Sequence, residues 1–315
     1  MGRFIIRRLI GMVGVLFAIS VLTFLIFEAI PNGDPALRIG GRLATQAEIA
    51  QIRQEYGFNK PIYVQYVRTM EKIFDGTVTS YTQGFNVDQE IRRALPATLS
   101  LAIGAGIIWL FFGIVFGVVT AITAGKTLDR LLTVLALIGV SCPVFFLGAL
   151  VLYYFGFEWG IIPLGGYVPI TQNPAEWFTH LIAPWLVLSV LFIGIYSRVL
   201  RSTILDTQGE DFVRTARAKG LSERQILMRH VLRNSLLPVL ALWGLDFAQV
   251  IGGGAILTET VFNLHGVGQL AASSIERLDI PPVLVIVMIT AFAVVIISAL
   301  IDVLYALLDP RIRLA

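Results

Sequence analysis

The chain has 315 residues, of which 56% are hydrophobic and 14% charged, with a mean hydropathy of +0.79. A soluble domain usually carries about 25% charged residues. One aqueous core of this size could not enclose so many apolar side chains, so the composition excludes an ordinary soluble protein and requires lipid as the solvent. The net charge is +3, but Lys and Arg lie beside apolar runs, which indicates membrane orientation and no nucleic-acid partner.

The cysteine and histidine content gives no support for disulfide bonds or metal sites. Cys142 is the single cysteine, so no internal disulfide and no cysteine-based metal cluster can form. The histidines are His180, His230 and His265, and their wide spacing does not predict a metal site. We therefore expect neither a metal nor another cofactor in this chain.

The amino terminus is basic and runs into an apolar stretch from Leu9 to Phe27. A cleaved signal peptide is the competing interpretation, but its apolar core would be shorter and a small-x-small cleavage site would follow. We predict an uncleaved signal anchor, so residues 1–30 form an amino-terminal segment with the first membrane helix.

About six stretches are long and apolar enough to cross a bilayer as helices, since a crossing takes roughly 20 residues. We place them near residues 9–30, 97–124, 131–155, 180–200, 236–258 and 283–308. The fourth contains Pro184 and carries the weakest signal of the six. The predicted fold class is all-α integral membrane, with residues 96–310 as the main transmembrane domain.

Residues 31–95, between the first two predicted helices, have a different pattern. The stretch Ala47–Tyr56 is amphipathic and ends at Gly57, which predicts a helix. Pro61 then leads into a second amphipathic stretch through Ile73. We predict a small external subdomain here.

The basic residues predict the orientation of the chain. Arg3, Arg7 and Arg8 precede the first helix, and eight Lys or Arg residues lie from Arg198 to Arg233, between the fourth and fifth helices. The positive-inside rule therefore places both termini and the segment 208–235 in the cytoplasm. Residues 31–95 also contain eight basic residues, but segments of this length are translocated largely regardless of charge.

Small residues occur at close spacing in two of the predicted helices. Gly113 and Gly117 form a G-x-x-x-G pattern, and Gly252, Gly253 and Gly254 lie late in the fifth helix. Such residues allow helices to pack closely. For the glycine triplet, a functional hinge is the alternative.

The cytoplasmic segment predicts two short helices joined by a turn. Asp211 suits the start of the first helix, and Gly220 supplies the left-handed residue that ends it. Ser222 and Gln225 form a capping box for the second helix, which leads into the fifth membrane helix. Phe212, Val213 and Ala216 are predicted to share one face of the first helix. That face could dock in a groove of another protein or lie on the anionic inner leaflet.

This segment, together with motifs elsewhere in the chain, resembles the coupling loop of ABC importer permeases. The resemblance is to the B-like transmembrane subunit of the oligopeptide/dipeptide/nickel permease family, and it rests on several motifs in order. They are Ile30–Ala36, Leu95–Leu101, Asp211–Arg224 with Leu237-Pro238, Glu259–Phe262, Gly266–Gly268 and Asp302–Arg311. The triplet Arg214-Thr215-Ala216 replaces the Glu-Ala-Ala of the general importer pattern, as is usual in this subfamily. Asp246 replaces an amide that is frequent in relatives.

The resemblance implies a type I ABC importer permease-like fold and half of a translocation path for di- or oligopeptides or related small solutes. It implies a second homologous permease subunit, two cytoplasmic ABC ATPase subunits that bind ATP and Mg, and an extracytoplasmic solute-binding protein. The location would be the inner membrane of a bacterium or archaeon. The implied ATPase-coupling residues are Asp211, Phe212, Val213, Arg214, Thr215, Ala216, Arg217, Ala218, Lys219, Gly220 and Leu221.

Polar residues within membrane helices are the default candidates for a solute path. Asp246 and Gln249 lie in the fifth predicted helix, and Glu259 lies near its outer end. Glu28 and Asp302 are further polar residues near or in apolar stretches. Structural pairing is the alternative role for each of them.

Other functions remain as alternatives. An ATP-independent secondary transporter or channel would lack a coupling loop and would often show inverted repeats. A membrane enzyme lacks support, since neither H-E-x-x-H nor G-x-S-x-G occurs. No ATP-binding P-loop occurs either, so we expect ATP hydrolysis in partner subunits. Nickel chelates and glutathione are alternative substrates that the resemblance leaves open.

Overall fold

The computed structural model describes residues 2–29, 35–41 and 44–308. Within these ranges the regular elements are helical, apart from one isolated bridge between Thr79 and Asn86. The first half of the chain forms α1 (Gly2–Phe24), η1 (Leu25–Ala29), α2 (Pro35–Gly40), α3 (Gln46–Tyr56), α4 (Ile62–Phe74), α5 (Val87–Ile122), α6 (Thr127–Ser141), α7 (Val144–Val151) and η2 (Leu152–Glu158). The second half forms α8 (Pro174–Gln208), α9 (Asp211–Ala218), α10 (Glu223–Ile226), η3 (Leu227–Val231), α11 (Leu232–Gln249), η4 (Val250–Gly254), α12 (Ile256–Val261), α13 (Val267–Glu276) and α14 (Ile280–Leu308).

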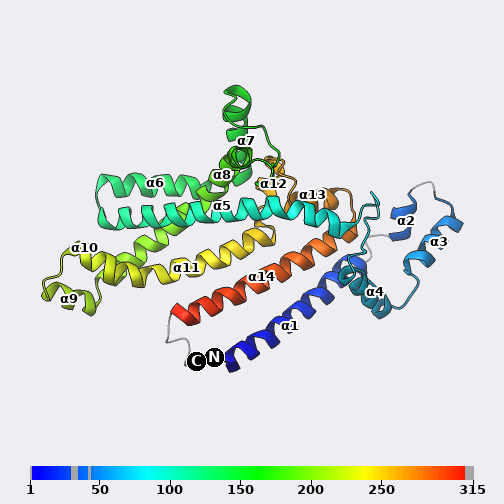
Figure 1. The fold of residues 1–315 in the computed structure, drawn as a ribbon, viewed down its shortest axis with the longest axis horizontal. Coiled ribbons are helices and arrows are strands. Elements are labelled where there is room, and N and C mark those ends of the chain that lie inside the picture. The colour runs from blue at the N-terminus through cyan, green and yellow to red at the C-terminus, as the bar shows by residue number, and fades with distance from the viewer. Residues whose placement is uncertain (1, 30–34, 42–43, 309–315) are drawn as a thin grey trace.

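The long helices run roughly along the long axis of the molecule, as Figure 1 shows for α1, α5, α6, α8, α11 and α14. The short helices α9 and α10 lie at one end of this bundle, and α2, α3 and α4 lie at the other. The start of α1 and the end of α14 both point toward the α9–α10 end. The external subdomain and the coupling segment predicted from the sequence therefore occupy opposite ends of the bundle.

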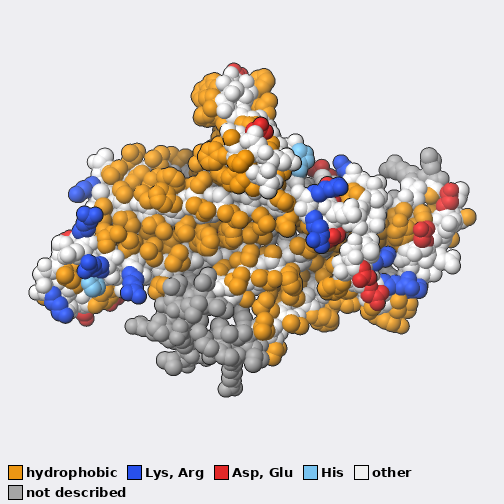
Figure 2. Space-filling model, viewed as in Figure 1, with side chains coloured by type: hydrophobic (Ala, Val, Ile, Leu, Met, Phe, Trp, Pro, Cys, Tyr) orange, Lys and Arg blue, Asp and Glu red, His pale blue; other side chains and the backbone are white. Residues whose placement is uncertain are grey.

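Five helical segments of the described chain are long and apolar enough to cross a membrane: Leu9–Phe27, Val87–Ile122, Pro174–Gln208, Glu223–Gly254 and Ile280–Ile301. A bent pair, Thr127–Ser141 with Val144–Glu158, raises the number to six if it is one span. The all-α membrane fold predicted from the sequence is confirmed. Figure 2 shows an apolar surface along the bundle, with Lys and Arg side chains toward its two ends.

The prediction of one helix near residues 131–155 is wrong in one respect, because the chain does not form a single straight helix there. The chain bends by 99° between α6 and α7, and α7 projects away from the bundle in Figure 1. Cys142 is extended, with φ −84° and ψ 121°, and Pro143 is the N-cap of α7. Proline disfavours helical backbone at the preceding residue and has no N–H to donate, so a break here is what Cys142-Pro143 should produce.

The fourth helix is longer than predicted. α8 spans Pro174–Gln208 with Pro184 in its interior. Asn173 caps its start by accepting hydrogen bonds from the N–H groups of Ala175 and Glu176. A proline inside a membrane helix is tolerated where neighbouring groups satisfy the freed backbone.

α5 and α8 form the centre of the bundle. Gly113 and Gly117 of α5 face Tyr196 and Leu200 of α8, where a Cβ on either glycine would lie 2.6 or 2.7 Å from a side-chain carbon. Tyr196 and Leu200 are fully buried. The G-x-x-x-G pattern therefore serves helix packing, as the sequence predicted.

The subdomain predicted to be external contains the two helices predicted between residues 47 and 73. A capping box between Thr45 and Glu48 begins α3, and Gly57 ends it with φ +76°. α4 follows directly after Pro61. α5 begins at Val87, so the last residues of the predicted 31–95 segment belong to α5.

Candidate functional site

The segment between α8 and α11 is a helix, a tight turn and a second helix. Asp211 lies in the first turn of α9 and Arg217 in its last, where each charge complements the helix dipole. Gly220 follows with φ +79°, and its N–H donates to the carbonyl of Arg217 at 2.9 Å. This left-handed position favours glycine and ends the helix as predicted.

A capping box begins the second helix. The Ser222 hydroxyl accepts from the N–H of Gln225 at 3.4 Å, and the N–H of Ser222 donates to the Gln225 side chain at 3.1 Å. Arg217 reaches across the turn to Glu223 through bonds of 2.8 and 3.1 Å. The capping box and the Arg217–Glu223 ion pair therefore both restrain the turn. After the turn, α10, η3 and α11 continue as one long helical segment.

The apolar face of α9 differs from the sequence prediction. Val213 and Ala216 are buried in the core of the chain itself, together with Ile226 and Val231 from the following helix. Phe212 is 42% exposed and stands outside that core. The predicted face of Phe212, Val213 and Ala216 is therefore not one docking face, because Val213 and Ala216 attach α9 to its own bundle.

The surface that α9 leaves available to a partner is the outward half of the helix. Its exposed residues are Asp211, Phe212, Arg214, Thr215, Arg217, Ala218, Lys219 and Gly220, while Leu221 is half-buried. Arg214 forms an ion pair with Asp211 at 3.4 Å. One exposed aromatic ring surrounded by charged side chains is a typical centre for a protein contact.

The end of α8 that leads into α9 is attached to α6. Arg201 binds the carboxylate of Asp129 in a bidentate ion pair, and the N–H of Gly125 donates to the same carboxylate at 2.9 Å. Asp129 is buried. The helix that leads into α9 is thus joined to the turn between α5 and α6.

Asp246 and Gln249 differ in their surroundings. The Tyr196 hydroxyl donates to Asp246 at 2.8 Å, which links α11 to α8. Asp246 is half-buried and Gln249 is exposed on the surface of this chain. Trp243 fixes the same stretch of α11 to α5 by donating to the carbonyl of Gly106 at 2.9 Å.

The glycine triplet coincides with a break in the helix. Gly253 has φ +125°, a non-helical conformation that kinks the chain inside η4, and α12 begins three residues later at Ile256. Gly252 faces Val294 of α14, where an added Cβ would lie at 2.6 Å. The triplet thus contributes both a kink and a close helix contact.

Glu259 is fully buried in α12, and its carboxylate accepts hydrogen bonds from three donors. The Thr98 hydroxyl donates at 2.7 Å and the N–H of Gln269 at 2.9 Å. The backbone of Gly268 also contributes a hydrogen bond. Thr98 in turn accepts from the N–H of Val267 at 2.9 Å. This network joins α5, α12 and α13.

The surroundings of Glu259 explain three sequence motifs at once. Thr98 comes from the Leu95–Leu101 motif, Glu259 from Glu259–Phe262, and Gly266 lies so close that a Cβ there would be 2.4 Å from the carboxyl group. Burial raises the pKa of Glu259, and the hydrogen bonds from Thr98 and the Gln269 and Gly268 backbone act in the opposite direction. Sequence reasoning placed Glu259 among the path candidates, and the structure places it in a buried clamp.

Several residues discussed above lie outside the described side chains, among them Arg3, Glu28 and Asp302. Glu28 belongs to η1 and Asp302 to α14 by backbone. The motifs at 30–34 and 309–311 also lie outside the described residues.

A chain with up to six candidate membrane-spanning helices, a helical hairpin at one end and a small helical subdomain at the other has the architecture of a multi-pass membrane protein. Comparison with known families specifies the class. Residues 113–314 match the family of binding-protein-dependent transport system inner membrane components, and residues 1–102 match the amino-terminal domain of such components. The chain belongs to this family and is a permease subunit.

Relatives agree over almost the full length. A probable peptide ABC transporter permease of Sinorhizobium fredii is 38% identical, covering 99% of this chain and 100% of the relative. A probable D,D-dipeptide transport system permease of Escherichia coli is 36% identical over 97% and 96%. A glutathione transport system permease of Salmonella paratyphi A is 35% identical over 99% of each chain.

The fold is similar to that of a solved importer. A chain from inward-facing structures of the MetNI methionine ABC transporter superposes with a TM-score of 0.54 at 18% identity. The match covers 70% of this chain and 97% of the other. It confirms the type I importer permease-like fold.

Proposed function

We propose that this chain is the permease subunit of an ATP-driven peptide importer, in which α9 docks on a cytoplasmic ATPase subunit. The observation that carries the coupling role is α9 itself. It is fixed to the bundle through Val213 and Ala216, held at its turn by Arg217 and Glu223, and exposes Phe212 outward. A helix attached in this way transmits force to α8 and α11, which flank it in the chain.

The remaining partners follow from the same proposal. A second homologous permease would supply the other half of the path, and two ATPases would bind and hydrolyse ATP with Mg. An external binding protein would deliver the solute at the end that carries α2, α3 and α4. ATP binding would favour one of two access states and hydrolysis the other, which is alternating access.

The orientation proposed from the basic residues agrees with this arrangement. α9 would lie in the cytoplasm of a bacterial or archaeal cell, with both termini on the same side. The clustering of Lys and Arg in the 198–233 region supports that side.

The coupling role is tested by replacing Phe212 with glutamine. Exposed aromatic anchors of this kind commonly contribute at least about 2 kcal/mol to an interface, which is a factor of roughly 30 in affinity. The complex of both permeases and the ATPases is purified from membranes carrying Phe212→Gln. Met228→Gln is the matched control, because Met228 is 57% exposed and lies near the same end, in η3.

We expect Phe212→Gln to lose the ATPases while the two permeases still co-purify, and Met228→Gln to keep all subunits. Full ATPase recovery and stimulation with Phe212→Gln would contradict docking through α9. The ATP-independent transporter would then become the better account.

The peptide class rests on the relatives, whose names include peptide, D,D-dipeptide and glutathione permeases. Uptake of a labelled dipeptide into cells that express the whole transporter tests it. Competition by unlabelled dipeptide, glutathione or a nickel chelate separates the three substrate classes. No uptake of the labelled dipeptide above that of cells lacking the transporter would exclude the dipeptide.

A further inference from the structure

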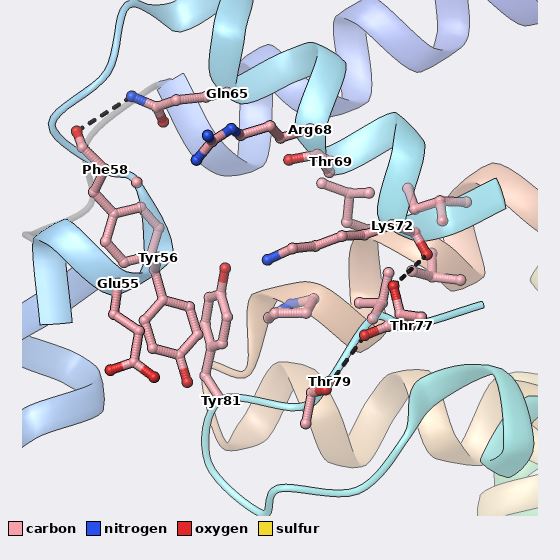
Figure 3. Close-up of a pocket in the computed structure, with 16 residues that line it drawn as sticks. Glu55, Tyr56, Phe58, Gln65, Arg68, Thr69, Lys72, Thr77, Thr79 and Tyr81 are labelled. Carbon is pink, nitrogen blue, oxygen red and sulfur yellow. Dashed lines mark hydrogen bonds between the residues drawn. The ribbon is translucent and has the colours of Figure 1, made fainter. Parts of the chain in front are cut away.

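A cavity of about 350 Å³ lies where the external subdomain meets the outer end of α14. Its walls come from the end of α3, one face of α4 and the 77–81 segment, and Pro281, Leu284 and Val285 contribute from α14 (Figure 3). A volume of this size suits a small ligand or a short piece of peptide chain. None of the coupling or path residues described above lines it.

One wall of the cavity is aromatic. The rings of Tyr56 and Phe58 stack with their centroids 5.8 Å apart. Tyr81 meets both rings edge-on, at 5.3 and 6.1 Å. Three mutually packed rings form a rigid surface against which an apolar or aromatic side chain can lie.

Hydrogen bonds fix both segments that carry this wall. The Gln65 side chain donates to the carbonyls of Phe58 and Lys60, at 3.2 and 2.7 Å. The N–H of Tyr81 donates to the buried carboxylate of Asp279 at 3.0 Å. The wall is therefore built before any ligand arrives, which lowers the entropic cost of binding.

Two cations face the aromatic wall from α4. Figure 3 shows the Lys72 ammonium and the Arg68 guanidinium reaching into the space from one side, opposite Phe58 and Tyr81. They are one helical turn apart, so their side chains lie on the same face of α4. Neither forms a salt bridge with an acidic residue of the part of the chain that the structure describes. The carboxylate of Glu55, which also lines the cavity, points away from them.

Two neighbouring cations beside an aromatic surface favour one kind of ligand. Arginine binds carboxylates through paired hydrogen bonds, and lysine adds a point charge. The rings accept the apolar group next to that carboxylate. We propose that this cavity binds a carboxylate of a peptide chain presented on the external side of the membrane. The carboxylate chemistry stands on the cavity, and the peptide class rests on the proposed function.

The proposal is tested on the assembled permease pair in lipid nanodiscs, without ATPases. Binding of fluorescently labelled Ala-Phe with a free carboxyl terminus is compared with binding of its carboxyl-terminal amide. An acetylated and amidated tripeptide with a central glutamate provides a carboxylate of the kind found within a protein segment. Variants Arg68→Gln and Lys72→Gln are set against Lys60→Gln, a change of equal charge in the same subdomain at a residue that does not line the cavity.

We expect at least one carboxylate ligand to bind, and Arg68→Gln and Lys72→Gln to weaken it about tenfold or more, as loss of a charged hydrogen bond does. Lys60→Gln should bind as the unaltered protein does. Binding of the free peptide identifies the peptide terminus as the source, and binding of the blocked glutamate peptide alone identifies an acidic segment of a protein partner.

Three results would overturn the proposal. The first is equal binding of Ala-Phe and its amide, together with no binding of the blocked glutamate peptide. The second is no binding of any peptide. The third is displacement of the peptide by inorganic phosphate at the same concentration. Because the ATPases are absent, failure here leaves the Phe212 result unaffected. Conversely, loss of coupling through α9 leaves this binding unaffected.

Discussion

Arg201 binds Asp129 through two parallel hydrogen bonds of 2.9 Å, from Nε to Oδ1 and from Nη2 to Oδ2. Only 7% of the Asp129 side chain is exposed, against 33% for Arg201. Because Arg201 lies near the end of α8, just before α9, this pair connects the proposed coupling helix to α6. Bidentate geometry adds directional restraint to the charge attraction.

Arg201→Lys should weaken that restraint while keeping the charge, since lysine cannot form the paired bonds. We expect the ATPases to remain bound and their stimulation by solute to fall severalfold, with a lower melting temperature that reflects about 1–3 kcal/mol of lost stability. ATPase recovery and activity in the purified complex measure both effects. Arg198→Lys is the control, because Arg198 is exposed on the same helix. Full stimulation with Arg201→Lys would show that the pair does not position α8.

A second prediction concerns the buried clamp around Glu259. In Glu259→Gln an amide NH₂ replaces one carboxylate oxygen and must face either the Thr98 hydroxyl or the N–H of Gln269, both of which donate to Glu259 in the native chain. Leaving a buried donor without its acceptor costs about 1–3 kcal/mol. We expect a clearly lower melting temperature for the permease pair. Glu276→Gln, at an exposed glutamate of α13, should have no effect.

The clamp also predicts a pH dependence. Burial raises the pKa of Glu259 above its usual value of 4.5, so the folded chain retains this proton at pH values where the unfolded chain has lost it. The contribution of Glu259 to stability is therefore fully present below the unfolded pKa and is lost as the pH rises through the folded one. Melting curves from pH 4 upward should show this slope in the native protein and lack it in Glu259→Gln. Equal slopes in the two proteins would contradict the raised pKa.

Sequence reasoning located the features that depend on nearby residues. The end of α9 at Gly220 and the capping box at Ser222 follow from local chemistry, and both are present. The membrane helices follow from apolar length. The break at Pro143 was also readable, since proline interrupts helices, but the continuous apolar run on both sides concealed it.

Features that depend on distant residues were not predictable in this way. Thr98 and Glu259 are 161 residues apart, and Asp129 and Arg201 are 72 apart. Which face of α9 is buried depends on how α10 and α11 return beside it, and so the burial of Ala216 was missed. The cations of the external cavity, Arg68 among them, carry no local motif, and only the fold brings them opposite the aromatic wall.

A fourth prediction concerns the connection between the 78–86 segment and the bundle. Asp279 is buried and accepts from the Ser80 hydroxyl, from the Tyr81 N–H at 3.0 Å and from the Thr82 hydroxyl at 2.8 Å. Asp279→Asn replaces one acceptor oxygen with a donor, so at least one of these bonds is lost. We expect backbone hydrogen exchange in the 78–86 segment to become at least about tenfold faster, as the loss of roughly 1.4 kcal/mol of local stability implies.

Asp75→Asn is the control for that experiment, because Asp75 is an exposed carboxylate in the same subdomain. Peptide binding to the external cavity should also weaken in Asp279→Asn, since Tyr81 belongs to its aromatic wall. Unchanged exchange in the 78–86 segment would show that the loop is held by other contacts.

The last prediction separates two roles for Asp246. Its carboxylate accepts the Tyr196 hydroxyl, which makes it a helix contact, and its position in α11 makes it a candidate for contact with solute. Tyr196→Phe removes the hydrogen bond and keeps the charge, whereas Asp246→Asn removes the charge and keeps an oxygen that can accept.

If Asp246 acts only as a helix contact, Tyr196→Phe should impair uptake of every dipeptide at least as much as Asp246→Asn does. If the charge acts on the solute, Asp246→Asn alone should lower uptake of a lysine-containing dipeptide relative to a neutral one, by about fivefold for a partly screened interaction of roughly 1 kcal/mol. We expect the second result, measured as the ratio of initial uptake rates in cells expressing the whole transporter, because the half-buried carboxylate forms no salt bridge within the described chain. An unchanged ratio would leave Asp246 with the structural role alone.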